Sequence, residues 1–421
     1  MGATSLPRKG RAGTGRPLWF AFMSAVVSLL AVFIGAAAPI PLYNTYRAAD
    51  GFTNADISLT IVVYALSVLV ALLMAGRLSN HLGRRTTAIA SLVLLLAAFA
   101  LFWDVHSIGT LLAARALTGL GAGIASSNVT AYVVDAAPAR PAWLTTVASS
   151  QLPMLGLAIG AVLSGTLVQF GPAPRQLIYA LAGVVAVLGI VLIALSPETV
   201  RRTPGAWRSL RPRLRLPSHV VPLLPVAAMV LLATWATASF YQAFVPSVVE
   251  EQLHTRSPLL IGLVFACYMA PSAFGASLSG RFSPARAQRL GMIGFVIGMI
   301  GIVTAIVAGD LALFIVATII AGAGQGVAIS ASTRALLFGS TVTERAPIFS
   351  VIYVISYCAS AIPSLLAGVL STTFSLEQIA VGYGVLALLS TIVTVIAARN
   401  PDAGANAPHG GVEQRRDRMV R

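Results

Sequence analysis

Twelve long runs of apolar residues, separated by short polar segments, take up most of the chain. Each run is close to the ~20 residues that a helix needs to cross a hydrocarbon layer of ~30 Å. The approximate ranges are 18–42, 57–76, 86–103, 107–134, 142–170, 176–196, 220–249, 257–280, 290–308, 311–333, 347–374 and 376–398. The pattern therefore predicts an all-α membrane protein with twelve transmembrane helices.

The runs are predicted to be helices because backbone groups inside lipid must find hydrogen-bond partners within their own segment. A transmembrane barrel would show alternating strands of about ten residues instead. The first run follows several basic residues and superficially resembles a signal peptide. It is longer than a usual signal sequence and eleven further runs follow, so we interpret it as a retained first helix.

The distribution of charge predicts an orientation for the helices. Of the 28 Lys and Arg residues, 24 fall on the side that carries both termini, together with 6 of the 13 acids. The other side has only Arg47, Arg175 and Arg256, and Arg115 lies inside the fourth run. The positive-inside rule then predicts a multi-pass plasma-membrane protein with both termini in the cytoplasm. The net charge of +15 reflects this topology and contacts with anionic lipid, and it gives no support to nucleic-acid binding.

The longest polar interruption, 198–219, separates six runs from six. It predicts a cytoplasmic tail at 1–17, a first six-helix bundle at 18–197, a linker at 198–219, a second bundle at 220–398 and a second cytoplasmic tail at 399–421. Two short repeats support this division. GRLS at 76–79 returns as GRFS at 280–283, and TGLGAG at 118–123 returns as AGAGQG at 321–326, with offsets of 204 and 203. Two pseudo-symmetric bundles related by an axis along the membrane normal are expected.

The segment GRLSNHLGRRT, residues 76–86, carries the most specific motif. Gly76, Gly83, Arg84 and Arg85 match the loop between helices 2 and 3 of the major facilitator superfamily, which the chain resembles along its whole length. The resemblance implies transport by alternating access and a cytoplasmic gate formed by this loop, with Asp135 as the partner of the arginines. The alternative is that a basic loop here only obeys the positive-inside rule.

Asn80 stands where the family usually has an acid, so we predict a weaker and less salt-dependent latch. Glu198 and Glu344 are further candidates for the same cytoplasmic network, or else unpaired loop acids.

Arg115 is an arginine inside a hydrophobic run, which costs at least ~2.5 kcal/mol and calls for a cavity or a partner. Together with Gly119, Gly121 and Gly123 it resembles the fourth-helix pattern of the family, whose arginine is associated with proton coupling or substrate contact. The alternative is that the side chain extends to the outer membrane surface. Gln325, between the repeated glycines of the tenth run, is predicted to act in coupling or substrate binding as part of a central cavity.

Small residues predict close helix packing. The pairs at GxxxG spacing are Gly119 with Gly123 and Gly322 with Gly326, and Gly156 and Gly160 keep one face of the fifth run small. In that run Gly160, Gly165 and Leu167 resemble a motif of exporters in the family, although Ala161 and Ser164 replace its usual proline and glycine. Pro153 is expected to kink the helix.

A broad, mostly apolar cavity is predicted from polar and aromatic residues on the central helices. The candidate lining residues are Asn128, Tyr132, Trp235, Tyr241, Gln242, Tyr268, Tyr353 and Tyr357. Aromatic residues near helix ends also form interfacial belts, which is the alternative for each of them.

No acid lies deep in any predicted span, so a cationic substrate lacks its usual counter-ion. We predict a monomeric secondary transporter, not an enzyme, without cofactor or metal, that exports small amphipathic molecules in exchange for protons. The alternatives are an importer of a small metabolite or organic anion, and a non-transporting receptor or scaffold.

Overall fold

The structure is a computed structural model that describes residues 16–76, 78–138, 141–200, 203–205 and 216–401. The predicted tails, at 1–17 and 399–421, and the centre of the linker lie largely outside these residues. Among the residues described, the secondary structure is helical and no strand occurs. Within the described residues, twelve helical spans are long and apolar enough to cross a membrane, as the sequence predicted.

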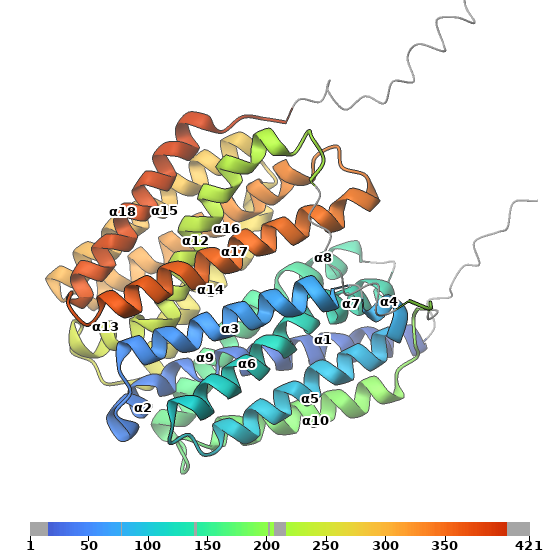
Figure 1. The fold of residues 1–421 in the computed structure, drawn as a ribbon, viewed down its shortest axis with the longest axis horizontal. Coiled ribbons are helices and arrows are strands. Elements are labelled where there is room, and N and C mark those ends of the chain that lie inside the picture. Colours follow the sequence, from blue (N-terminus) through green and yellow to red (C-terminus); the bar gives the residue numbers. More distant parts are fainter. Residues whose placement is uncertain (1–15, 77, 139–140, 201–202, 206–215, 402–421) are drawn as a thin grey trace, which may run out of the picture.

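The first half of the chain forms the lower bundle in Figure 1. Its helices are α1 (Arg16–Ala37), α2 (Tyr43–Asp50), α3 (Asn54–Ala75), α4 (Ser79–Leu82), α5 (Arg84–Phe102), α6 (Ile108–Ile124), α7 (Thr130–Ala136), α8 (Ala142–Ser150), α9 (Leu152–Phe170) and α10 (Leu177–Leu195). A 3₁₀ turn, η1 (Ile40–Leu42), joins α1 to α2, and a π-helical turn, η2 (Ala125–Val129), joins α6 to α7.

The second half forms the upper bundle. Its helices are α12 (Leu224–Ala243), α13 (Val245–Glu251), α14 (Pro258–Ser279), α15 (Pro284–Ala308), α16 (Leu311–Leu337), α17 (Val342–Leu370) and α18 (Leu376–Ala397), preceded by the 3₁₀ turn η3 (Val221–Leu223). We call the end at which α1 begins and α18 ends the terminal face. The opposite end, with α2 and α13, is the far face (Figure 1).

Proline shapes two of the spans. Pro39 and Pro41 flank the point where the first span, Leu18–Asp50, changes from α1 to α2. The run predicted at 142–170 is two helices rather than one kinked helix, because α8 ends at Ser150 and α9 restarts with Pro153 in its first turn. Proline is tolerated there because the first-turn N–H groups have no intrahelical partner.

Glycine allows the same helix contact in each bundle. A Cβ on Gly119 or Gly123 of α6 would lie 2.6 Å from the carbonyl oxygen of Tyr64 or 2.7 Å from that of Val68. In the second bundle, a Cβ on Gly322 or Gly326 of α16 would lie 2.3 Å from the carbonyl oxygen of Tyr268 or Ser272, respectively. Tyr64 and Val68 are related to Tyr268 and Ser272 by the offset of 204 that relates GRLS to GRFS. The internal repeat of the sequence is thus also a repeat of backbone contacts.

The two bundles meet along a seam formed by α3 against α17 and α9 against α14. Backbones approach closely there: a Cβ on Gly165 would lie 2.4 Å from the carbonyl oxygen of Pro258, and one on Gly262 would lie 2.3 Å from that of Ala161. Gly156 and Gly160 pack α9 against Phe33 and Ile34 of α1 instead. One face of α9 therefore packs within its own bundle while another forms the seam.

Candidate functional site

The break in the first span forms a polar site inside the first bundle. Helix α1 ends at Ala37, where its last carbonyl groups have no intrahelical partner and the helix dipole is negative. The fully buried Arg115 of α6 donates a hydrogen bond from Nη1 to the carbonyl oxygen of Ala36, at 2.8 Å. Its Nε donates to the hydroxyl of Tyr43 at 2.8 Å, and Nη2 donates to the same oxygen. Arg115 thus joins the end of α1 to the start of α2.

The Arg115 guanidinium also lies over two aromatic rings. Its central carbon is 5.3 Å from the centre of the Tyr43 ring and 5.6 Å from that of Tyr64 in α3. Within the described part of the chain it forms no ion pair with a carboxylate. A helix C-terminus and π faces therefore balance this charge instead of an acid. The alternative in which Arg115 extends to the membrane surface is wrong, since the side chain is enclosed by the bundle.

Ser164 of α9 contacts the same break. Its hydroxyl donates to the carbonyl oxygen of Ala38 at 2.5 Å. Ser164 stands where the exporter motif usually has glycine, so the departure from that motif adds one more donor to the end of α1.

Hydrogen bonds between the bundles gather at the far face, and we call this group the far-face latch. Arg47 of α2 donates to the hydroxyl of Ser247 at 2.6 Å and forms an ion pair with Glu251 of α13 at 2.8 Å. Asn44 donates to the carbonyl oxygen of Pro246 at 2.8 Å, and Ser247 donates to Asn54 Oδ1 at 2.8 Å. Because Asn44 directly follows Tyr43, the Arg115 site and the latch share helix α2.

Aromatic side chains line the middle of the seam. Tyr357 of α17 packs against Val62 and Ala65 of α3. The Trp235 ring of α12 lies edge-on to Tyr357, with 4.9 Å between ring centres. Among the residues described, the Trp235 indole N–H has no hydrogen-bond partner. Together with the half-buried Tyr353 and Gln242, these residues remain candidates for contact with a substrate.

Three predicted cavity residues are instead packed inside the second bundle. Tyr241 and Tyr268 are fully buried and stack with 4.1 Å between ring centres. Tyr268 donates to Gln325 Oε1 at 2.8 Å, and the Tyr241 hydroxyl lies 2.6 Å from that of Thr318. Gln325 is 3% exposed, so its amide finds its partner in the helix bundle and not in an open cavity.

Asn128 and Tyr132 were also predicted to line the cavity, and this prediction is wrong in the structure. Both are fully buried. Asn128 donates to the carbonyl oxygen of Ala75 at 3.1 Å, and Tyr132 donates to that of Pro197 at 2.6 Å. They connect η2 and α7 to neighbouring chain segments near the terminal face.

Of the 76–86 segment, residues 78–86 lie on the terminal face and include α4 and the start of α5. Gly76 ends α3, and Gly83 has a φ of 97°, which favours glycine. Arg84 forms an ion pair with Asp135, with 2.8 Å between Nε and Oδ2, and Arg85 donates to the carbonyl oxygen of Ala194. Both partners belong to the first bundle. In this conformation these hydrogen bonds and ion pairs of Arg84 and Arg85 therefore do not join the two bundles.

Glu198 belongs to this network. Its carboxylate accepts hydrogen bonds from the backbone N–H groups of Arg84 at 2.8 Å and Arg85 at 3.2 Å. Since Gly83 has no side chain with which to cap α5, Glu198 supplies the cap and a negative charge at the positive helix end. Glu344 is not part of the network, because it forms a capping box with Thr341 at the start of α17.

The side chain of Asn80 is exposed. Its backbone carbonyl accepts hydrogen bonds from Thr203, at 3.3 Å from the N–H and 3.2 Å from the hydroxyl. The latch predicted for Asn80 concerns the opposite conformation and stays a prediction.

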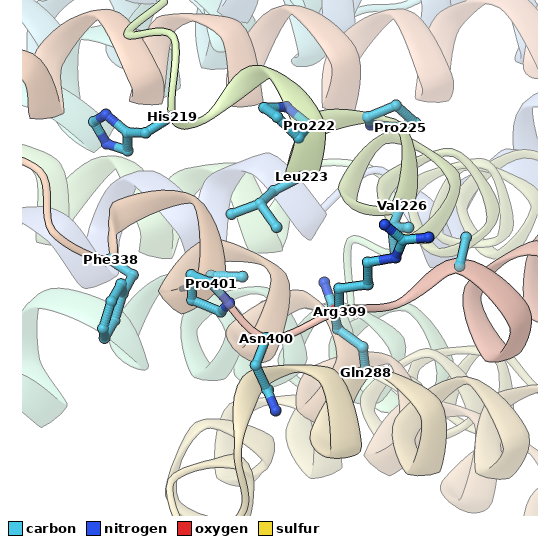
Figure 2. Close-up of a pocket in the computed structure, with 12 residues that line it drawn as sticks. His219, Pro222, Leu223, Pro225, Val226, Gln288, Phe338, Arg399, Asn400 and Pro401 are labelled. Atoms are coloured by element: carbon cyan, nitrogen blue, oxygen red, sulfur yellow. The ribbon is translucent and has the colours of Figure 1, made fainter. Parts of the chain in front are cut away.

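A pocket of about 460 Å³ lies at the terminal face of the second bundle, between the ends of α12, α15, α16 and α18 (Figure 2). His219, Gln288, Arg399 and Asn400 contribute its polar groups. None of the residues predicted to bind substrate lines it.

Sequence reasoning also missed Tyr43 and the far-face latch, because their partners come from segments far apart in the chain. A weak signal was present in Arg47, one of only three arginines that the predicted topology places on that side of the membrane.

Comparison with known proteins places the fold. A family model described as Major Facilitator Superfamily matches residues 20–289 and 226–418. The quinolone resistance protein NorA of Staphylococcus aureus is 21% identical over 214 residues, 51% of this chain and 54% of NorA. The match thus spans about half the length of this relative. The multidrug transporter mfsC of Aspergillus fumigatus is 30% identical over 115 residues, 27% of this chain and 22% of mfsC.

Solved structures cover nearly the whole chain. The inward open conformation of the xylose transporter XylE from E. coli has a TM-score of 0.72 and 13% identity, covering 92% of this chain and 97% of XylE. A crystal structure of a D-xylose-proton symporter has a TM-score of 0.70 and 16% identity, covering 92% of this chain and 99% of that protein. At these identities the likeness concerns the fold alone. From the family model and the twelve-helix fold, the chain belongs to the major facilitator superfamily of membrane transporters.

Proposed function

We propose that the protein exports small amphipathic molecules across the plasma membrane in exchange for protons, as its two bundles rock about the seam. The observation that carries this proposal is the far-face latch, which joins α2 to α13 by hydrogen bonds and an ion pair. Polar contacts of this kind can break and re-form at low cost, because exposed ion pairs contribute ~1 kcal/mol or less. With the terminal face in the cytoplasm, a closed latch corresponds to an inward-facing state.

The substrate proposal rests on aromatic residues at the seam and on the buried Arg115 inside the first bundle. Trp235, Tyr353 and Tyr357 offer aromatic surface and a free indole N–H. Arg115 is a cation whose partners are a carbonyl and a hydroxyl, so an anionic group is a stronger acceptor than either. We therefore expect neutral or anionic amphiphiles. The similarity to NorA supports export. The charge of Arg115, which has no carboxylate partner among the residues described, favours import of an organic anion as the second candidate.

The test uses everted membrane vesicles that contain the protein, a fluorescent quinolone as probe and an imposed pH gradient. If the proposal holds, the probe accumulates when the vesicle interior is acidic, and a protonophore abolishes the accumulation. Accumulation that ignores the gradient would refute proton coupling. Uptake seen only in right-side-out vesicles would replace export by import.

A further inference from the structure

A second pocket, of about 450 Å³, lies on the seam at the far face. Asn44, Thr45 and Ala48 of α2 line one side, and Glu250, Arg256 and Ile261 of the second bundle line the other. The volume is in the range of small-molecule sites. The pocket is separate from the Arg115 site and from the aromatic residues in the middle of the seam.

Glu250 gives this pocket its chemistry. Its neighbour Glu251 is engaged by Arg47 at 2.8 Å, whereas Glu250 lies 3.5 Å from the Nε of Arg256. The Arg256 side chain is 89% exposed and that of Glu250 is 31% exposed. Such a long, exposed ion pair contributes little. The Glu250 carboxylate therefore retains acceptor capacity toward a cation that approaches from within the pocket.

Beside Asn44 and Thr45, apolar groups line the pocket, including Pro41, Ala48 and the buried Ile261. A carboxylate beside apolar surface complements a ligand with an ammonium group and an apolar body. We infer that this pocket binds small amphipathic amines, and that a bound amine holds the far face closed.

A bound amine can hold the far face closed because the walls of the pocket belong to different bundles. Both bundles contribute to the pocket, so any rocking that separates α2 from α13 also separates the two sides of the site. A ligand that contacts both sides binds the closed state better and shifts the population toward it. The closing role of the amine rests on the proposed transport cycle, whereas the binding of an amine does not.

The test measures binding of phenylbutylamine to the purified full chain in lipid nanodiscs by calorimetry, with phenylbutanol as the uncharged analogue. The amine should bind more tightly than the alcohol.

Glu250→Gln should weaken amine binding about tenfold, the equivalent of one charge-assisted hydrogen bond. Arg256→Gln should strengthen amine binding. Glu377→Gln, a matched change in the first turn of α18 at the same face, should leave it unchanged. Equal binding of amine and alcohol, or an unchanged affinity in Glu250→Gln, would overturn the site.

Arg47→Ala tests the link to closure, because it breaks the latch at a residue that does not itself line the pocket. Among the described residues, its only side-chain hydrogen bond to a lining residue is a long one to Asn44, at 3.5 Å. Amine binding should weaken in this variant, since the closed state is less populated. Unchanged affinity would refute the closing role. If the amine binds through Glu250 but the vesicles transport no probe, the proposed function fails while the binding site stands.

Discussion

At the scale of single residues, the guanidinium of Arg115 joins the last turn of α1 to the hydroxyl of Tyr43 inside the first bundle. The sequence shows that an arginine lies within a membrane span and therefore needs partners. It does not show that these partners are the last turn of α1 and the hydroxyl of Tyr43, because neither is an acid or a near neighbour in the chain. Tyr241, Tyr268 and Gln325 show the same limit. Their polarity predicted contact with a cavity, but the bundle interior satisfies their hydrogen bonds.

Replacing Arg115 tests its role at the break. In Arg115→Ala the hydroxyl of Tyr43 and the carbonyl of Ala36 each lose a buried donor, at ~1–3 kcal/mol per group. We expect normal membrane insertion, a lower thermal unfolding temperature and loss of gradient-driven probe accumulation. Arg115→Lys keeps the charge but cannot hold both acceptors in a planar fork, so it should be intermediate. Full activity of Arg115→Ala would show that the site has no part in transport.

At the scale of elements, glycine spacing was a reliable guide. The pairs in α6 and α16 have carbonyl oxygens of α3 and α14 as neighbours, at positions related by the repeat. Span ends were less reliable, since α15 begins at Pro284 where the apolar run suggested 290. The difference arises because Arg286, Gln288 and Arg289 occupy the first turns of α15 at the terminal face. A prediction from hydrophobicity alone assigns such a polar segment to a loop.

A single added methyl group tests the close contact of α14 with α16. Gly322→Ala would place a Cβ 2.3 Å from the carbonyl oxygen of Tyr268, so the helices must separate. We expect destabilisation of ~1–3 kcal/mol, measured by thermal unfolding in detergent. Gly382→Ala in α18 is the matched control, because nothing lies within 4 Å of its added Cβ. Equal unfolding temperatures for the two variants would contradict the packing described.

The cap on α5 can be tested in the same way. Glu198→Gln leaves one acceptor oxygen for two backbone N–H groups and removes the charge at the helix start. The expected loss is ~1 kcal/mol. Asn80→Asp adds a charge on the same turn at an exposed side chain and should not change the unfolding temperature. A stability loss in Asn80→Asp but not in Glu198→Gln would reverse the assignment of the cap.

At the scale of the whole molecule, the sequence was sufficient for the twelve spans and the family, because membrane-spanning length and repeated motifs are local properties. The sequence did not predict the conformation, because the conformation depends on which polar residues of one bundle meet those of the other. Arg47 and Glu251 are 204 residues apart and become a pair only when the far face closes. Rocking about the seam predicts that this closure is transient and that transport requires it to be reversed.

The most direct test of this claim is to lock the far face. A Cβ on Gly368 of α17 would lie 3.5 Å from the Cα of Ala55 in α3, close enough for a disulfide between Ala55→Cys and Gly368→Cys. The two native cysteines, Cys267 and Cys358, would first be replaced by serine. A Cβ on Gly368 also lies 2.7 Å from the Cβ of Ser58, so the Gly368→Cys single variant is the reference for activity. If the two bundles rock, oxidation of the pair abolishes probe accumulation in everted vesicles and reduction restores it to the level of that reference, while oxidant has no effect on either single cysteine variant. Undiminished accumulation in the fully oxidised pair would contradict transport by rocking of the two bundles.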